Sequence, residues 1–315
     1  MHTRLRALLL AAVLVSLGAH HLRAQAPAPA TSPLRQLLSR QLQRQLDSLA
    51  ASTSGVVGIA VEDLSSGEHF GVNDSLTFPQ ASAIKVALLL ELIRQADTGT
   101  LALSERVEVP ASQHVGGDGV LQSFADRGSA LSLHDLAVLM VTLSDNTATN
   151  VLLQRVGMAN VNRLLAGLGL GEIRFGRSMM RPDESARGNE NLATPRAAAR
   201  LMVRLARCEL PMSRRACDDA RRMLEIPKSG TVADALPAGV PVAWKPGSLD
   251  GVATAWALVR LRDRPYVVAV MVSYGDAHVD DVVRSTVRLT HAYFARLAST
   301  TPFGVHVPDT LLPPR

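Results

Sequence analysis

The side chains best suited to chemistry in this sequence are its three lysines, Lys85, Lys228 and Lys245, which are a small minority of 33 basic residues. Arginine stays protonated in proteins, whereas a buried lysine can lose its proton and act as a base. Because this chain uses arginine for nearly every other positive charge, its few lysines are the candidates for a role that requires loss of a proton. We expect the chemistry of this protein to take place at the lysines.

The first lysine belongs to the motif S-x-x-K, formed by Ser82-Ala83-Ile84-Lys85. Residues three apart share one face of a helix, so Lys85 is expected beside Ser82. The following segment, 86–93, is apolar nearly all round and predicts a helix that is buried on every side. Burial lowers the pKa of a lysine, and a helix amino terminus favours a developing negative charge. These conditions favour a nucleophilic serine; the alternative is that Ser82 caps a core helix and Lys85 is a chance neighbour.

Two further motifs follow along the chain. Ser144-Asp145-Asn146 comes directly after a helix expected at 133–143, and such a tripeptide often does no more than cap the next helix. Lys245-Pro246-Gly247 ends a strand expected at 240–245. Neither tripeptide is specific alone. Their order, with 62 residues from Ser82 to Ser144 and 101 from Ser144 to Lys245, indicates a single site.

The hydrophobic pattern predicts the elements that must position these motifs. Strands are expected near both ends of the chain, at 56–62, 68–72, 240–245, 252–261 and 265–273. Helices are expected at 34–50, 82–96, 133–143, 148–156, 160–168, 195–207 and 280–298. This order predicts an α+β fold in which one sheet is built from both ends of the chain and a helical lobe is inserted between them.

Composition excludes some classes of partner. The chain has 315 residues, of which 47% are hydrophobic and 19% charged, as in a globular protein. Residues 1–24 hold three arginines and no acid, which leaves 30 basic against 28 acidic groups in the remainder. So small a surplus, together with 3% aromatic residues, argues against a nucleic-acid partner.

The amino terminus has the order of a secretory signal: a basic start at 1–6, an apolar run at 7–17 and small residues around 24–26. We expect a signal peptide at 1–24, a linker at 25–33, a hydrolase domain at 34–300 and a tail at 301–315. The apolar run is short for a bilayer span, so no stable membrane anchor is expected; the rival interpretation is an uncleaved anchor. A periplasmic or secreted protein would allow Cys208 and Cys217 to form a disulfide, although two separate buried thiols remain the alternative.

Taken together, the three motifs resemble those of the class A serine β-lactamases and the related penicillin-binding serine hydrolases. The resemblance runs from about residue 55 to 297 and is supported by the stretches 78–81, 116–122 and 145–150. It implies an antiparallel five-stranded sheet flanked by helices, with an all-helical lobe. It also implies a small-molecule β-lactam substrate and no metal or cofactor; we expect a monomer.

The resemblance implies a role for each catalytic residue. Ser82 would attack the carbonyl of a strained cyclic amide and become acylated, with Lys85 as the proton acceptor. Ser144 would pass a proton to the departing nitrogen, assisted by Lys245.

The resemblance also implies the substrate-binding residues. Asn146 would bind the side-chain amide of the substrate, and Gly247 is expected among the substrate-binding residues. The backbone N–H groups of Ser82 and Ser248 would form an oxyanion hole. Pro246 stands where the family has Thr or Ser, so the hydroxyl that binds the substrate carboxylate would have to come from Ser248 or Thr254. A proline also places this strand at a sheet edge.

The segment 179–191 departs from the family's E-x-x-x-N pattern, whose glutamate activates the water that frees the acylated serine. Asp183 and Glu184 are the candidates for that base, and solvated loop charges are the competing interpretation. Without a base the acyl-enzyme would persist. The sequence therefore predicts a secreted β-lactamase, with two alternatives: a DD-peptidase-like penicillin-binding hydrolase of poor turnover, or a non-catalytic penicillin-binding sensor.

Overall fold

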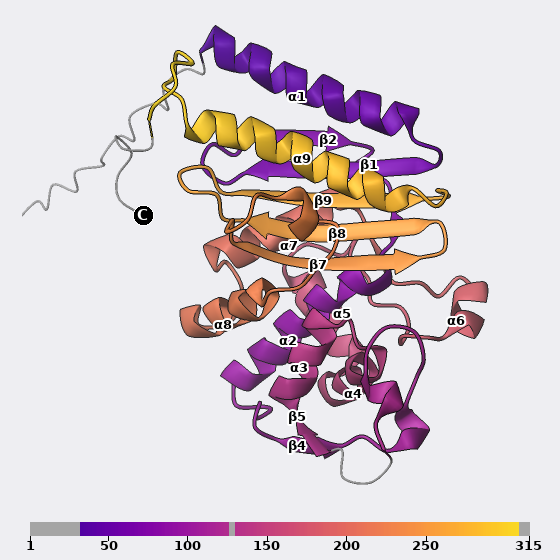
Figure 1. Ribbon diagram of the computed structural model, residues 1–315. Coiled ribbons are helices and arrows are strands. Elements are labelled where there is room, and N and C mark those ends of the chain that lie inside the picture. The colour runs from indigo at the N-terminus through magenta and orange to yellow at the C-terminus, as the bar shows by residue number, and fades with distance from the viewer. Residues whose placement is uncertain (1–31, 126–129, 309–315) are drawn as a thin grey trace, which may run out of the picture.

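The computed structural model describes residues 32–125 and 130–308 (Figure 1). The expected signal peptide at 1–24, most of the expected linker and the last seven residues of the expected tail lie outside the described residues.

One antiparallel sheet organises the molecule, with strand order β2-β1-β9-β8-β7. Its central strands, β8 and β9, are apolar without alternation because both of their faces are buried. The predicted five-stranded sheet built from both ends of the chain is confirmed. The strands are β1 (Val56–Asp63), β2 (His69–Val72), β7 (Val242–Leu249), β8 (Val252–Val259) and β9 (Tyr266–Ser273).

The first and last long helices, α1 (Pro33–Ser52) and α9 (Val279–Ala298), lie side by side against one face of the sheet (Figure 1). Their apolar residues, such as Leu46 and Phe294, pack with Val268 and Val270 of β9 in one buried cluster. Since β1 also pairs with β9 along its whole length, the two ends of the chain depend on each other for burial.

The opposite face carries α7 (Pro195–Arg207) and, beyond it, the helical lobe (Figure 1). The centre of the lobe is α2 (Lys85–Asp97), in which ten of thirteen residues are buried. The other helices of this part are α3 (Leu133–Thr142), α4 (Asn146–Val156), α5 (Met158–Gly167), α6 (Pro182–Ala186) and α8 (Arg214–Glu225). Two short ladders complete it, β3 (Phe78–Pro79) with β6 (Leu192–Ala193) and β4 (Arg106–Glu108) with β5 (Ala130–Ser132). No described helix is both long and apolar enough to cross a membrane.

Three local expectations were wrong. Ser82 does not lie in the long helix but in a preceding 3₁₀ turn, η1 (Ala81–Ile84). The strand expected to end at Lys245 continues to Leu249, so the K-x-G motif lies within β7. Helix α8 was not predicted, because its charged residues outnumber the apolar ones that it buries.

Two other expectations are settled by the structure. Pro246 lies in β7, an edge strand, as the missing N–H of proline requires. Cys208 and Cys217 form a disulfide with their Cα atoms 5.7 Å apart, which joins the end of α7 to α8.

Candidate active site

Ser82 lies where the sheet meets the helical lobe, on η1 and against the edge strand β7. The approach is close: a Cβ at Gly247 would stand 2.6 Å from Gln80 O and 2.7 Å from Ala83 N, so only glycine fits. Ala81, just before the serine, adopts φ +46°, a conformation that costs a non-glycine residue about 1 kcal/mol. The backbone is therefore held in a specific shape at the serine.

Lys85, three residues after Ser82, is completely buried. Its Nζ lies 2.7 Å from Ser144 O, 2.9 Å from Asn146 Oδ1 and 3.2 Å from Ser144 Oγ. Burial lowers the pKa of Lys85 to about 7, against the opposing effect of the Asp118 and Asp145 carboxylates. Among the hydrogen bonds of the described residues, none joins Lys85 Nζ to Ser82 Oγ; the amine is bonded to Ser144 and Asn146.

Ser144 holds its hydroxyl between two amines. Lys245 Nζ donates to Ser144 Oγ at 3.1 Å and to Pro246 O at 3.0 Å, while Lys85 approaches the same oxygen from the other side. The pKa of Lys245 lies well below its ordinary value, because the amine is buried and near the positive charges of Lys85 and Lys228. Ser144 itself has φ +55°. A hydroxyl between two titratable amines can relay a proton.

Asp145 and Asn146 connect this centre to the loop at 116–122. Asp145 caps α4 by accepting from Ala148 N, and its second oxygen accepts from Val120 N and Leu121 N at 2.7 and 2.9 Å. Asn146 donates from its backbone to Asp118 O and from Nδ2 to Gly116 O, each at 3.1 Å. The S-D-N motif is thus both a helix cap and part of the site.

A pocket of about 370 Å³ opens beside Ser82. Ser82, Asn146 and Ser248 line it together, as expected for a nucleophile, an amide ligand and an oxyanion contact. Asp118 also lines the pocket. Among the described residues that line this pocket, it is the one that carries a carboxylate. Asp118 lies in a stretch that supported the resemblance, but no role could be assigned to it from sequence.

Thr254 does not reach this pocket. It is buried, and its Oγ1 donates at 2.9 Å to the carbonyl oxygen of Gln80, two residues before Ser82. Gln80 is in turn held by Trp256, whose Nε1 donates to Gln80 Oε1 at 2.9 Å. These side chains position η1, a role that only the tertiary contacts between β8 and η1 reveal.

Part of the pocket wall comes from the segment 177–185, whereas Lys85, Ser144 and Lys245 are not among the residues that line the pocket. Asn150 on α4 fixes it by accepting from Met179 N at 2.8 Å and donating to Met179 O at 3.2 Å. The Met179 side chain, 5% exposed, lines the pocket together with Met180 and Arg181.

The structure does not bring Asp183 and Glu184 to Ser82. Both lie on α6 outside the pocket lining and form ion pairs with Arg181 and Arg187. Arg181 holds the pKa of Asp183 far below its usual range, which makes that carboxylate a poor base. Glu184 also accepts from Asn189 Nδ2 at 2.7 Å.

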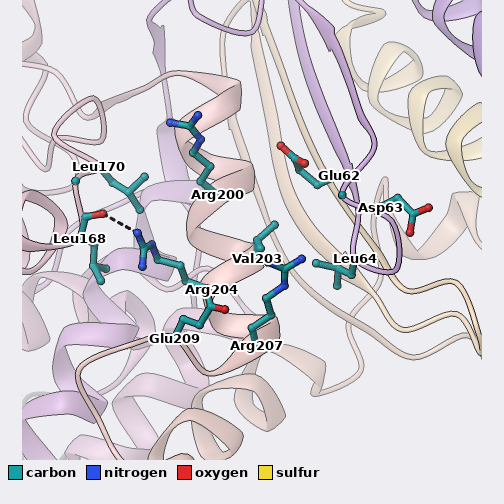
Figure 2. Close-up of a pocket in the computed structure, with 12 residues that line it drawn as sticks. Glu62, Asp63, Leu64, Leu168, Leu170, Arg200, Val203, Arg204, Arg207 and Glu209 are labelled. Atoms are coloured by element: carbon teal, nitrogen blue, oxygen red, sulfur yellow. Dashed lines mark hydrogen bonds between the residues drawn. The ribbon is translucent and has the colours of Figure 1, made fainter. Parts of the chain in front are cut away.

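A second groove, about 420 Å³, lies apart from these motifs, between α7 and the turn after β1 (Figure 2). Arg200, Arg204 and Arg207 line it along one side of α7, with Glu62 and Asp63 across from them. Its charges are mixed and none of the motif residues reaches it. No group of three or more potential metal ligands occurs in the described part of the chain.

Comparison with known proteins agrees with this geometry. The model of the beta-lactamase enzyme family matches residues 41–294. Beta-lactamase CARB-3 from Pseudomonas aeruginosa is 28% identical over 168 residues, which are 53% of this chain and 58% of that protein. The matched region thus spans little more than half the length of this curated relative.

Two solved structures extend the comparison over most of the chain. An ancestral class A beta-lactamase is 27% identical with a TM-score of 0.74, covering 81% of this chain and 100% of that one. A PBP-A mutant, solved as an acyl-enzyme complex with penicillin-G, is also 27% identical with a TM-score of 0.74, covering 81% and 97%. With the family model spanning the sheet, the helical lobe and all three motifs, the chain belongs to the beta-lactamase enzyme family and has the class A fold.

Proposed function

We propose that this protein is an exported serine hydrolase that opens β-lactams through an acyl-enzyme on Ser82. The observation that carries the proposal is the placement of the Ser144 hydroxyl between the amines of Lys85 and Lys245, beside a pocket lined by Ser82. The PBP-A relative, solved as an acyl-enzyme with penicillin-G, supports acylation of this kind of site.

The groups in the site account for a balanced acylation step. Ser82 Oγ bonds to the lactam carbonyl carbon and gives up its proton to neutral Lys85, which a pKa of about 7 makes available near neutral pH. The ring C–N bond then breaks as Ser144 Oγ donates a proton to the leaving nitrogen. The Lys85 ammonium returns a proton to Ser144 Oγ across their 3.2 Å contact. The net change moves one proton from Ser82 to the nitrogen.

The geometry also orients the substrate. The leaving nitrogen must lie on the Ser144 side, whereas the pocket extends from Ser82 toward Met179 and Arg181. The acyl portion that stays bound to Ser82 would therefore occupy the pocket, with its amide near Asn146. Backbone N–H groups of Ser82 and Ser248 would stabilise the oxyanion.

One observation favours a second candidate, a penicillin-binding hydrolase of slow turnover. Asp183 and Glu184 are held in ion pairs away from the pocket, and Asp118 is the one carboxylate among its described lining residues. Hydrolysis of the acyl-enzyme needs a base to activate water. If Asp118 or Lys85 serves poorly in that step, acylation would outpace release.

Intact-protein mass spectrometry with a chromogenic cephalosporin tests the proposal and separates the two candidates. Sustained colour change with a transient adduct on Ser82 is expected for a β-lactamase. A single burst with a lasting adduct would instead establish the penicillin-binding hydrolase. Ser82→Ala should abolish the adduct, while Ser52→Ala, on α1, should not. An adduct that persists in Ser82→Ala would overturn the assignment of the nucleophile.

A further inference from the structure

Lys228, the lysine that belongs to none of the three motifs, also lies near the active site. It follows α8, and its Nζ donates to Leu224 O at 2.7 Å and to Ile226 O at 3.0 Å. These carbonyls belong to the carboxyl end of α8, where helix carbonyls lack intrahelical donors and carry partial negative charge. The ammonium of Lys228 is therefore stabilised by the carbonyl oxygens at this end of α8.

The same ammonium lies over an aromatic ring, with Nζ 5.4 Å from the centre of the Trp244 ring. A cation over an indole face is attracted by the negative charge density of the ring. Gly230, two residues further on, approaches so closely that a Cβ there would lie 3.1 Å from the same indole. The segment after α8 therefore encloses Trp244, which is only 2% exposed.

Trp244 immediately precedes Lys245 on β7. Neighbouring residues of a strand point to opposite faces, so contacts that hold the indole on one face fix the backbone from which Lys245 projects on the other. This support matters because β7 is an edge strand with β8 as its single partner in the sheet. The contacts of Lys228 join α8 to the strand at the residue next to a catalytic amine.

We propose that Lys228 is a positioning residue for the active site: it fixes the edge strand at Trp244, and its positive charge acts on Lys245, the next residue along β7. The charged groups that act on Lys245 are Lys85 from α2, Lys228 from the connection after α8, and Asp118 from the loop at 116–122. Besides burial, the charges of Lys85 and Lys228 favour the neutral amine at Lys245, and the carboxylate of Asp118 opposes them. The pKa of Lys228 itself is lowered to about 8 by burial, so this side chain is mostly protonated at pH 7.

A capping role for Lys228 alone makes a different prediction. If the amine merely satisfied the carbonyls of α8, its replacement would lower stability and leave the titration of Lys245 unchanged. The experiment must therefore follow the protonation of Lys245 itself.

The composition of the chain makes that measurement direct. With three lysines in the whole sequence, selective labelling at lysine Cε gives three NMR resonances, which single Lys→Arg variants assign. We expect the titration midpoint of Lys245 to rise by about half a pH unit or more in Lys228→Met, because a neighbouring positive charge is removed. Lys228→Arg keeps the charge and should leave the midpoint near its wild-type value. Arg222→Met, which removes an exposed cation from α8, is the matched control and should also leave it unchanged.

The wild-type protein provides a test that needs no substitution. If the two amines interact, the Lys245 resonance must show a second inflection at the pH where Lys228 titrates. Absence of that inflection, or an unchanged Lys245 midpoint in folded Lys228→Met, would overturn the proposal. The inference deepens the proposed function, but its test uses no substrate. A protein that fails to react with β-lactams would contradict the proposed function while leaving the lysine coupling intact.

Discussion

At the scale of single residues, the site is a set of buried amines whose charges are controlled by their surroundings. Burial brings the pKa of Lys85 down to about 7, and the carboxylates of Asp118 and Asp145 limit that decrease. Acylation by the proposed route requires neutral Lys85, the form that predominates above this pKa. The rate should therefore rise with pH through about 7 and level off above it.

Asp118→Asn tests this account of Lys85. Removing a negative charge that favours the ammonium should move the pKa of Lys85 to a lower value, so the rising limb of the acylation rate should shift to lower pH. Rapid-mixing measurements of acylation between pH 5 and 9 would show the shift. Asp183→Asn, which removes a carboxylate outside the pocket, should leave the profile unchanged. A limb that moves to higher pH in Asp118→Asn would contradict this assignment of charges.

The motif residues were predictable from sequence, because S-x-x-K, S-D-N and K-x-G are local patterns in a fixed order. Thr254 was proposed as a substrate ligand, yet it is buried and bonded to Gln80 O. No local sequence feature distinguishes a threonine that binds substrate from one that is bonded to a neighbouring turn. Which way a strand residue points at an active-site edge depends on the register between β7 and β8, which places Thr254 opposite Gly247.

At the scale of elements, the contact between η1 and β7 determines the geometry around Ser82. Gly247→Ala would place a methyl group 2.6 Å from Gln80 O and 2.7 Å from Ala83 N, both backbone atoms that cannot rotate away. We expect the strand to separate from η1, with a loss of about 1–3 kcal/mol in the free energy of unfolding and more than about tenfold slower acylation.

Chemical denaturation and burst kinetics would measure both effects of Gly247→Ala. Gly167→Ala is the control, since no heavy atom lies within 4 Å of a Cβ built there. Its stability should not fall, because Ala is favoured over Gly within a helix. Wild-type acylation in Gly247→Ala would show that the close approach is not required.

The segment 177–185 offers a test of how the acyl-enzyme is released. Met179 lines the pocket, is nearly buried, and is held at both backbone atoms by Asn150. Met179→Glu would place a carboxylate there whose pKa burial raises, which suits a general base. We expect the Ser82 adduct to decay at least about tenfold faster, within the range that general-base catalysis supplies.

The lifetime of the adduct by mass spectrometry measures the effect of Met179→Glu. Met180→Glu is the matched control, because this neighbour also lines the pocket but is 46% exposed, so its carboxylate would be solvated. Equal acceleration in both variants would mean that charge in the pocket, and not a positioned base, controls release.

The elements themselves were predicted best where an apolar pattern dominates. Strands β8 and β9 and helix α2 are nearly continuous apolar runs. Helix α8 was missed because its buried positions, including Ala216, Ala220 and Leu224, are separated by arginines and aspartates. From sequence, the turn η1 was assigned to the following helix. Its tighter 3₁₀ geometry accompanies tertiary contact with β7, and the local sequence pattern does not encode that contact.

At the scale of the whole molecule, the fold class followed from strands at both ends of the chain around a helical middle. The location of the site between sheet and lobe did not follow from hydrophobic pattern. It was supplied by the family resemblance, because three motifs on different elements converge only through long-range packing.

The disulfide tests how far the site depends on global stability. It closes a short loop between α7 and α8, with a sequence separation of 9, and such a link contributes about 2–3 kcal/mol in the chain-entropy model. Replacing Cys208 and Cys217 by Ser together should lower the melting temperature and leave acylation at 25 °C nearly unchanged, because neither sulfur lines the pocket. Calorimetry and burst kinetics on the same preparation would check this. A large loss of activity in the still-folded variant would imply that the bridge shapes the site.

Strand β1 emerges early in synthesis, but its long antiparallel partner β9 is among the last segments to be made. Ser82 and Lys245 of β7 are likewise separated in sequence by the whole helical lobe. A nascent chain on the ribosome would therefore lack the complete site that we propose until its final third has been made. Acylation of Ser82 should therefore require the completed polypeptide. A chain that is halted or cleaved before β9 should not react with β-lactams.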